Sequence, residues 1–85
     1  MIFEKLKEKL KEAVVNLNVH ADHDDRWENG RYFGQVEVLT MMIEAMGHRV
    51  DGQNKKTRDG KVTHIIYMTL DGEKIGELKH DLEEE

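Results

Sequence analysis

The chain has 85 residues, of which 38% are hydrophobic, and it carries a net charge of −5 at pH 7. This length predicts one domain, close to the lower limit at which a chain builds a self-sufficient core. The sequence contains no cysteine, serine or proline, which excludes disulfides, thiolate metal ligands and serine or cysteine nucleophiles. No stretch has the ~20 apolar residues of a membrane span, and the charged N-terminus is unlike a signal peptide. We therefore expect a cytoplasmic protein that uses no cofactor.

Residues 2–14 have the period of an amphipathic helix. Their apolar residues recur every three or four positions and share one face, which consists of Phe3, Leu6, Leu10, Ala13 and Val14. We expect this helix to continue to about Leu17. The segment 15–21 alternates strictly between apolar and polar residues, however, so a short strand is the alternative there.

A second helix is predicted over residues 25–47, after a polar connection at residues 20–25. Asp25 and Glu28 form a capping box, in which the two side chains bond to backbone amides of the first turn. Gly47 follows the last apolar residue and is a typical helix stop in the left-handed conformation.

Apolar residues occur on two opposite sides of this second helix. The broader stripe consists of Tyr32, Val36, Leu39, Ile43 and Met46, with Phe33 and Met42 beside it. The opposite stripe, here called the tryptophan stripe, consists of Trp27, Gly30, Gly34, Val38, Met41 and Ala45. A helix with two apolar sides has to be covered on both. Either the first helix covers the tryptophan stripe, or the stripe is a self-association face, where glycines permit a close helix crossing and Trp27 anchors one end.

The rest of the sequence predicts a three-stranded antiparallel meander. Asp59-Gly60 and Asp71-Gly72 each separate two extended segments and are typical of two-residue type I′ turns. The segment 62–70 is the most apolar and is predicted to be the central strand. The lysine-rich strand before it is typical of an exposed edge.

The second turn also predicts the register of the last hairpin. A two-residue turn pairs Met68 with Ile75 and Ile65 with Leu78. The core side of the central strand is predicted to hold Val62, His64, Ile66, Met68 and Leu70. The other, partly exposed side is predicted to hold Ile65, Tyr67 and Leu78.

Charge is distributed unevenly along the chain. Residues 48–64 carry a net charge of +3, whereas residues 19–47 carry −4. The predicted acidic surface consists of Asp22, Asp24, Asp25, Glu28, Glu37 and Glu44. The predicted basic hairpin consists of Lys55, Lys56, Arg58 and Lys61. The overall acidity argues against a general DNA-binding protein, and the basic hairpin is explained either by nucleic-acid contact or by an edge strand protected from aggregation.

Signals for metal binding or catalysis are weak. His20, Asp22 and His23, with Asp24 beside them, have donor atoms that bind zinc, but their spacing is no established ligand pattern. The alternative is that they are solvated groups that place negative charge near a helix start. His64 could form an acid–base pair with Glu37 or Glu44, or be a hydrogen-bonded core histidine. We expect no enzyme activity and no small-molecule substrate.

The segments WENGRYFGQ and LTMMIEAMGH, between a lysine- and glutamate-rich helix and a polar hairpin, resemble the small accessory proteins encoded by bacteriophages and prophages. The residues that carry the resemblance are Trp27, Glu28, Gly30, Gly34 and Glu44–Gly47. The resemblance implies a host-takeover or anti-defence inhibitor, acting in the host cytoplasm on a basic, nucleic-acid-binding host protein through an acidic surface similar to DNA. The basic hairpin departs from that pattern.

Together these patterns predict an α+β fold, with two helices followed by a three-stranded antiparallel β-meander in a single domain at residues 1–79. Residues 80–85 are predicted to be a disordered acidic tail. The predicted function is binding of a protein partner, by a chain that is itself a homodimer. The alternatives are nucleic-acid contact through the basic hairpin and metal binding by the loop at residues 20–24.

Overall fold

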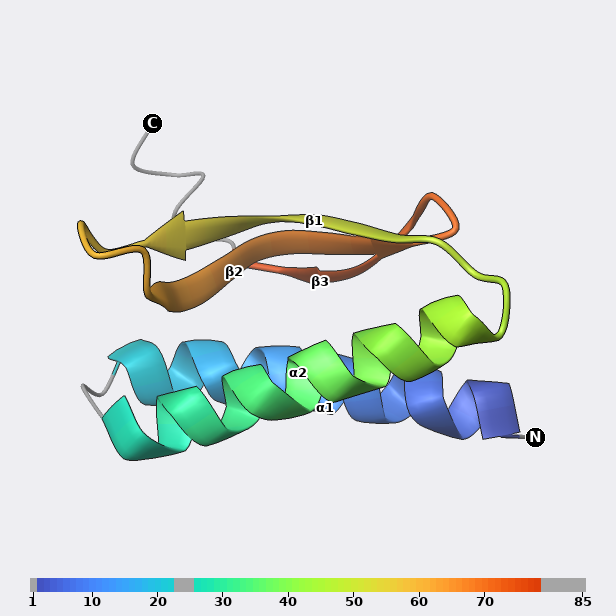
Figure 1. Ribbon diagram of the computed structural model, residues 1–85, viewed down its shortest axis with the longest axis horizontal. Coiled ribbons are helices and arrows are strands. Elements are labelled where there is room, and N and C mark those ends of the chain that lie inside the picture. The colour runs from blue at the N-terminus through green and yellow to red at the C-terminus, as the bar shows by residue number, and fades with distance from the viewer. Residues whose placement is uncertain (1, 23–25, 79–85) are drawn as a thin grey trace.

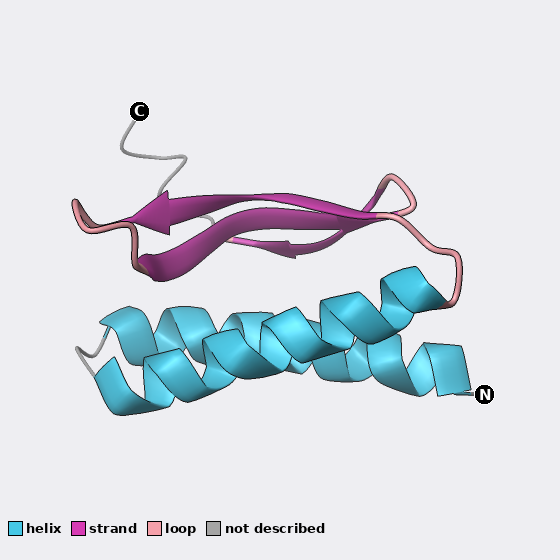
Figure 2. Cartoon of the chain, in the orientation of Figure 1, coloured by secondary structure: helices cyan, strands magenta, loops and turns pink. Residues whose placement is uncertain are grey.

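The computed structural model describes residues 2–22 and 26–78. It contains the helices α1 (Ile2–Asp22) and α2 (Arg26–Ala45), followed by the strands β1 (Val50–Lys56), β2 (Val62–Leu70) and β3 (Glu73–Glu77). The strands form one antiparallel sheet in the order β1-β2-β3, so the predicted α+β fold is confirmed. The two helices lie side by side as one layer under the sheet (Figures 1 and 2). The predicted tail at residues 80–85 lies outside the described residues.

Helix α1 is longer than its apolar period predicts. It continues to Asp22, so the alternative strand at residues 15–21 and the non-helical connection from residue 20 are both wrong. The alternation in this segment has another cause, because Asn18 is a buried polar residue that points inward. The predicted inward face is confirmed, since Leu10, Val14 and Leu17 are buried and the more N-terminal members of the face pack against them.

Helix α2 ends as predicted. Gly47 has a φ of +96°, and its amide donates to the carbonyl of Glu44 over 3.0 Å. This left-handed residue satisfies a carbonyl of the last turn and directs the chain toward the sheet. The capping box cannot be placed in the same way, because Asp25 lies outside the described residues. Neither α1 nor α2 is long and apolar enough to cross a membrane.

The core lies between the helix layer and one face of the sheet. Its most deeply buried large side chains are Leu10, Val14, Leu17, Ile43 and Ile65. Helix α1 approaches β3 closely, since a Cβ at Gly76 would lie 3.0 Å from a methyl carbon of Val14. Gly76 is therefore the residue that permits α1 and β3 to pack at this distance.

The two hairpin turns differ from each other. Asp71 and Gly72 both have positive φ, as the predicted type I′ turn requires. At the first turn only Gly60 has positive φ, and the closing bonds join Thr57 and Lys61. The first turn is therefore a three-residue loop, and the two-residue prediction is wrong there. The Thr57 hydroxyl bonds to the Asp59 carboxylate and accepts from the Lys61 amide, which stabilises the longer loop.

A β-bulge in β2 changes which residues face the core. Gln53 pairs with Tyr67 and Asn54 with Ile65, so Ile66 has no partner on β1. Such an extra residue shifts the inward side of the strand from even to odd positions. Met68 and Leu70 are buried as predicted, but Ile65, predicted to lie on the outer side, is 1% exposed, and Val62, His64 and Ile66 are only half-buried. The predicted core face is therefore wrong before the bulge and correct after it.

The β1–β2 pairing has a second irregularity, between Lys55 and Lys56, and a further bulge lies in β3. Thr69 pairs with Lys74 and Met68 pairs with Gly76, which leaves Ile75 as the extra residue. The predicted pairs Met68–Ile75 and Ile65–Leu78 are therefore wrong. The amide of Leu78 instead donates to the carbonyl of Ile66 over 2.7 Å, and Leu78 is buried rather than partly exposed.

Candidate protein-binding surface

The tryptophan stripe of α2 faces away from the rest of the chain. Trp27 is 74% exposed, Met41 69% and Val38 56%, and Gly30 and Ala45 are exposed beside them. The opposite side of the same helix carries the buried Val36 and Ile43. The interpretation that helix α1 covers the stripe is therefore wrong, and self-association remains a prediction. One side of a helix with several large apolar residues in water is a candidate interaction surface.

The two glycines of the stripe have no packing function within the described chain. A Cβ at Gly30 or Gly34 would meet no other heavy atom within 4 Å. Each interior glycine lowers helix stability by about 1 kcal/mol relative to alanine. At Gly76, by contrast, the absent side chain makes room for Val14. The glycines of α2 therefore leave space that the described part of the chain does not fill.

Arg31 contacts the aromatic residues at the N-terminal end of the stripe. Its guanidinium carbon lies 6.0 Å from the centre of the Trp27 ring and 5.1 Å from that of Tyr32. An ion pair of 3.3 Å joins it to Glu28. The hydrogen bond to the Tyr32 hydroxyl, followed by the charge of Glu28, raises the pKa of Arg31 above its usual value. This cluster presents an aromatic ring with a permanent cation beside it.

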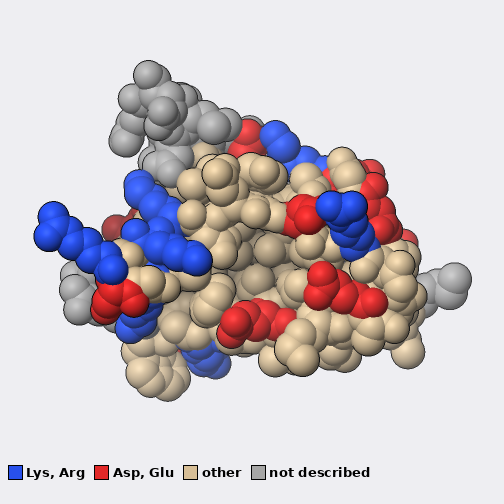
Figure 3. Space-filling view, turned by 45° about the horizontal axis from the view of Figure 1, so that its top comes forward, with Lys and Arg blue, Asp and Glu red and all other residues tan. Residues whose placement is uncertain are grey.

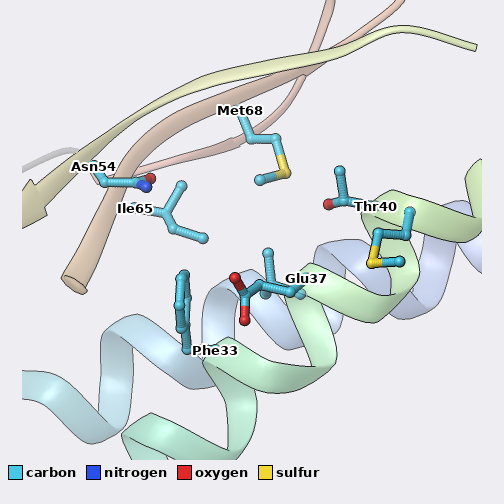
Figure 4. Close-up of a pocket in the computed structure, with 8 residues that line it drawn as sticks. Phe33, Glu37, Thr40, Asn54, Ile65 and Met68 are labelled. Atoms are coloured by element: carbon cyan, nitrogen blue, oxygen red, sulfur yellow. The ribbon is translucent and has the colours of Figure 1, made fainter. Parts of the chain in front are cut away.

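A groove runs between α2 and the sheet, next to the tryptophan stripe. Its volume is about 330 Å³, and its lining comprises Phe33, Val36, Glu37, Thr40, Met41, Asn54, Ile65 and Met68. Figure 4 shows Ile65 and Met68 directed from the sheet toward Phe33 and Thr40 of the helix, with the carboxylate of Glu37 at the side. The Oγ1 atom of Thr40 is buried and has no hydrogen-bond partner among the residues that the structure describes. The groove was not predicted from the sequence, because the bulge at Ile66 turns Ile65 into it.

The predicted acidic surface is only partly brought together. Glu37 and Glu44 are exposed and lie two turns apart on the same side of α2. Asp22 is instead paired with His64, and Glu28 with Arg31. Asp24 and Asp25 lie outside the described residues.

The predicted basic hairpin forms one charged end of the molecule. All four of its cationic residues, Lys55, Lys56, Arg58 and Lys61, are exposed. In Figure 3, most Lys and Arg side chains of this face gather at the end where the β1–β2 hairpin lies. Asp and Glu lie mainly over the rest of the face, and an uncharged hollow separates the two groups. This face therefore has a basic end and an acidic end.

The predicted metal ligands do not form a metal site in the described residues. The ring of His20 stacks on Tyr32, with 5.2 Å between ring centres. The Oδ1 atom of Asp22 lies 2.8 Å from Nε2 of His64, so the acid beside His64 is Asp22 and not the predicted Glu37 or Glu44. His23 and Asp24 lie outside the described residues. Within residues 2–22 and 26–78, no three His, Asp or Glu residues are arranged to hold a metal ion.

Two buried asparagines connect the helices to β2, and sequence analysis missed both. Asn18 of α1 donates to the carbonyl of Ile65 and accepts from the amide of the same residue, at 3.0 and 2.9 Å. Asn29 of α2 donates to the carbonyls of Leu17 and Thr63. The bonds to Ile65 and Thr63 satisfy buried backbone groups next to the bulge in β2, and the bond to Leu17 joins the two helices. The available signal was an amide residue on the apolar face of an amphipathic helix.

At the end of the molecule opposite the basic hairpin, a histidine–aspartate pair joins the start of α1, the segment after α2 and the β2–β3 turn. The His48 ring stacks on Phe3 with 3.9 Å between centres, and its Nδ1 lies 2.7 Å from a carboxylate oxygen of Asp71. The Arg49 amide donates to the other oxygen over 2.8 Å. This amide bond, followed by the bond to His48, lowers the pKa of Asp71. The pair fastens the segment after α2 to the second hairpin turn.

Neither a protein-family model, nor a curated protein, nor a solved structure matches this chain.

Proposed function

We propose that this chain is a non-enzymatic protein-binding module that docks its partner through the tryptophan stripe of α2. The observation that carries the proposal is the exposure of Trp27, Val38 and Met41 on a helix whose other side is already packed in the core. Interfaces are enriched in Trp, Met and Arg relative to other surfaces. Trp27, Met41 and Arg31 are of these types and lie on or beside the stripe.

The shape of the stripe supports a helix or another flat surface as the contact. Gly30 and Gly34 leave open space between Trp27 and Val38, and small residues permit two helices to approach closely. Trp27 is the large anchor at one end, which is the type of residue that contributes most binding free energy. The neighbouring groove accepts an apolar side chain of a partner.

The narrower proposal is a phage-type inhibitor that presents acidic residues to a basic host protein. Exposed Glu37 and Glu44 on one side of α2 support it. Competition with DNA for that partner tests it, and displacement of the partner from DNA is expected at low ionic strength, where charge contacts are strongest. If binding to the partner is independent of salt and DNA, the acidic surface is not the contact.

The alternative proposal is a nucleic-acid contact through the basic hairpin, whose lysines and arginine are exposed at one end of the molecule. This proposal predicts that the protein binds DNA directly and that the binding weakens steeply with salt. The double variant Lys56→Glu, Arg58→Glu is expected to lose this binding. If DNA retention is unchanged by the two substitutions, the hairpin has no such function.

Site-specific photo-crosslinking tests the main proposal. A photoreactive residue replaces Val38 in one variant and Val15 in the other, in the cell that makes the protein. The two valines have matched exposures of 56% and 57% but lie on different helices. We expect discrete crosslinked species from position 38 and a weak, diffuse background from position 15. Equal yields from both positions would contradict the proposal.

A further inference from the structure

We infer that the partner on the tryptophan stripe is a second copy of this chain, with the two α2 helices antiparallel and crossing near Gly34. This inference rests on the proposed function and names its partner. A chain of 85 residues with a small core gains stability from such an assembly. In a two-fold dimer the same patch is used by both copies, so the patch has to be complementary to itself.

The spacing of the stripe has this self-complementarity. Trp27 and Met41 are each seven residues from Gly34, which is two helical turns in opposite directions. An antiparallel crossing at Gly34 therefore brings Trp27 of one copy opposite Met41 of the other. By the same arithmetic, Val38 of one copy lies opposite Gly30 of the other. The valine side chain then occupies the space that the glycine leaves open.

The groove extends this contact. Met41 belongs both to the stripe and to the lining of the groove. The Trp27 ring of the second copy therefore meets the rim of the groove, where apolar side chains of α2 and β2 form the lining. A large ring against such a lining is typical of the centre of an interface.

Charge complementarity favours the antiparallel arrangement. The basic hairpin lies near the N-terminal end of α2, on the sheet side (Figure 1). Glu37 lines the groove on the sheet side of α2, and Glu44 lies two turns further toward the C-terminal end. A two-fold axis perpendicular to α2 keeps both sheets on the same side and reverses the ends. It brings the basic hairpin of each copy to the acidic flank of the other, whereas a parallel pair would place the two basic ends at the same end of the dimer.

A charge exchange tests this arrangement. One variant carries Glu37→Lys and Glu44→Lys, and the other carries Lys56→Glu and Arg58→Glu. Sedimentation at low ionic strength is expected to show a dimer for the wild type. Each variant alone is expected to lose at least roughly tenfold in affinity, because like charges oppose each other across the interface. An equimolar mixture is expected to restore a dimer that contains both variants.

Three results would overturn the inference: a monomeric wild type at every concentration, two variants that associate as the wild type does, or a mixture that forms no mixed dimer.

Circular dichroism of each variant verifies that the helices are intact. The emission of Trp27, the single tryptophan, gives a second measurement, since it shifts to shorter wavelength with concentration when a second copy covers the ring. Val38→Asp is expected to abolish that shift, and Val15→Asp to preserve it.

The crosslinking experiment separates this inference from the proposed function. Adducts of twice the chain mass from position 38 support both. Adducts with a different protein from position 38, together with a monomeric wild type, leave the binding module standing and overturn the dimer. Equal yields from positions 38 and 15 contradict both.

Discussion

The two helices of this protein have nearly the same length, 21 and 20 residues, but they use their apolar residues differently. Helix α1 buries Leu10, Val14 and Leu17 on one face, and its exposed apolar residues are Ile2, Val15 and Val19. Helix α2 contributes Val36 and Ile43 to the same core and leaves Trp27 and Met41 in water. Both helices therefore expose apolar residues, but the exposed tryptophan and the two glycines with open space beside them lie on α2. The proposed function rests on the apolar residues of α2 that remain exposed after folding.

The largest expected effect is on the core side of α1. Leu17→Ala removes a fully buried side chain, so we expect the free energy of unfolding to fall by about 2–5 kcal/mol. Met41→Ala on the exposed side of α2 is expected to change it by less than about 0.5 kcal/mol in the monomer. Urea unfolding at low protein concentration measures both. A loss at Met41 as large as that at Leu17 would show that the stripe belongs to the core of the single chain.

The next effect concerns the connection between α1 and the bulged strand. Asn18→Ala removes the bonds to both the amide and the carbonyl of Ile65, and we expect a loss of stability of about 1–3 kcal/mol from the unsatisfied groups. Asn16→Ala, two residues earlier and less buried, is the matched control. Urea unfolding is expected to show a large loss for Asn18 and a small change for Asn16. Similar midpoints for the two variants would show that Asn18 does not support the bulge.

A smaller effect of opposite sign is expected at the glycines. Gly34→Ala is expected to stabilise the monomer by about 0.5–1 kcal/mol, because the new methyl group meets no atom and alanine favours a helix. Gly76→Ala is expected to destabilise it, because the new Cβ would lie 3.0 Å from Val14. Thermal melting of dilute protein compares the two. A loss of stability in Gly34→Ala would mean that a neighbour inside the chain occupies that space.

The smallest effect concerns Asp71, which is exposed and holds the segment after α2. Its pKa in the folded protein lies below the ordinary value of 3.8, so its contribution to stability is present above pH 3.8 and is lost as the pH falls through the lowered pKa. The stability difference between wild type and Asp71→Asn is therefore expected to shrink as the pH falls below 3.8. NMR titration of the Asp71 carboxyl measures the pKa directly. A midpoint at or above 3.8 would contradict the assigned bonds to Arg49 and His48.

The order and type of the elements follow from local patterns in the sequence. The 3.6-residue period of α1, the stop at Gly47 and the Asp71-Gly72 turn each depend on a few neighbouring residues, and all three predictions are confirmed. The two-sided character of α2 could also be predicted, because it depends only on helical geometry. Which side of α2 remains exposed depends on where α1 and the sheet pack, and that is a tertiary property.

The errors in strand register and in the core face of β2 have one physical source, which is the β-bulge. The bulges at Ile66 and Ile75 each insert one residue, and one residue is enough to exchange the two faces of a strand. The buried position of Ile65, the groove that it lines and the bonds from Asn18 all follow from this change. Ile65, Ile66 and Tyr67 are consecutive apolar residues, and the sequence alone does not determine which of them faces the core, so the groove could not be predicted.

The close packing of Val14 against Gly76 has a consequence for the order of folding during synthesis. Helix α1 is translated before the strands, yet part of its buried face is covered by β3, the last strand of the described chain. The sheet-facing part of this apolar face is not covered by β3 until β3 has left the ribosome. We therefore expect the two helices to pair early through contacts that are closer in sequence, and β3 to complete the core later.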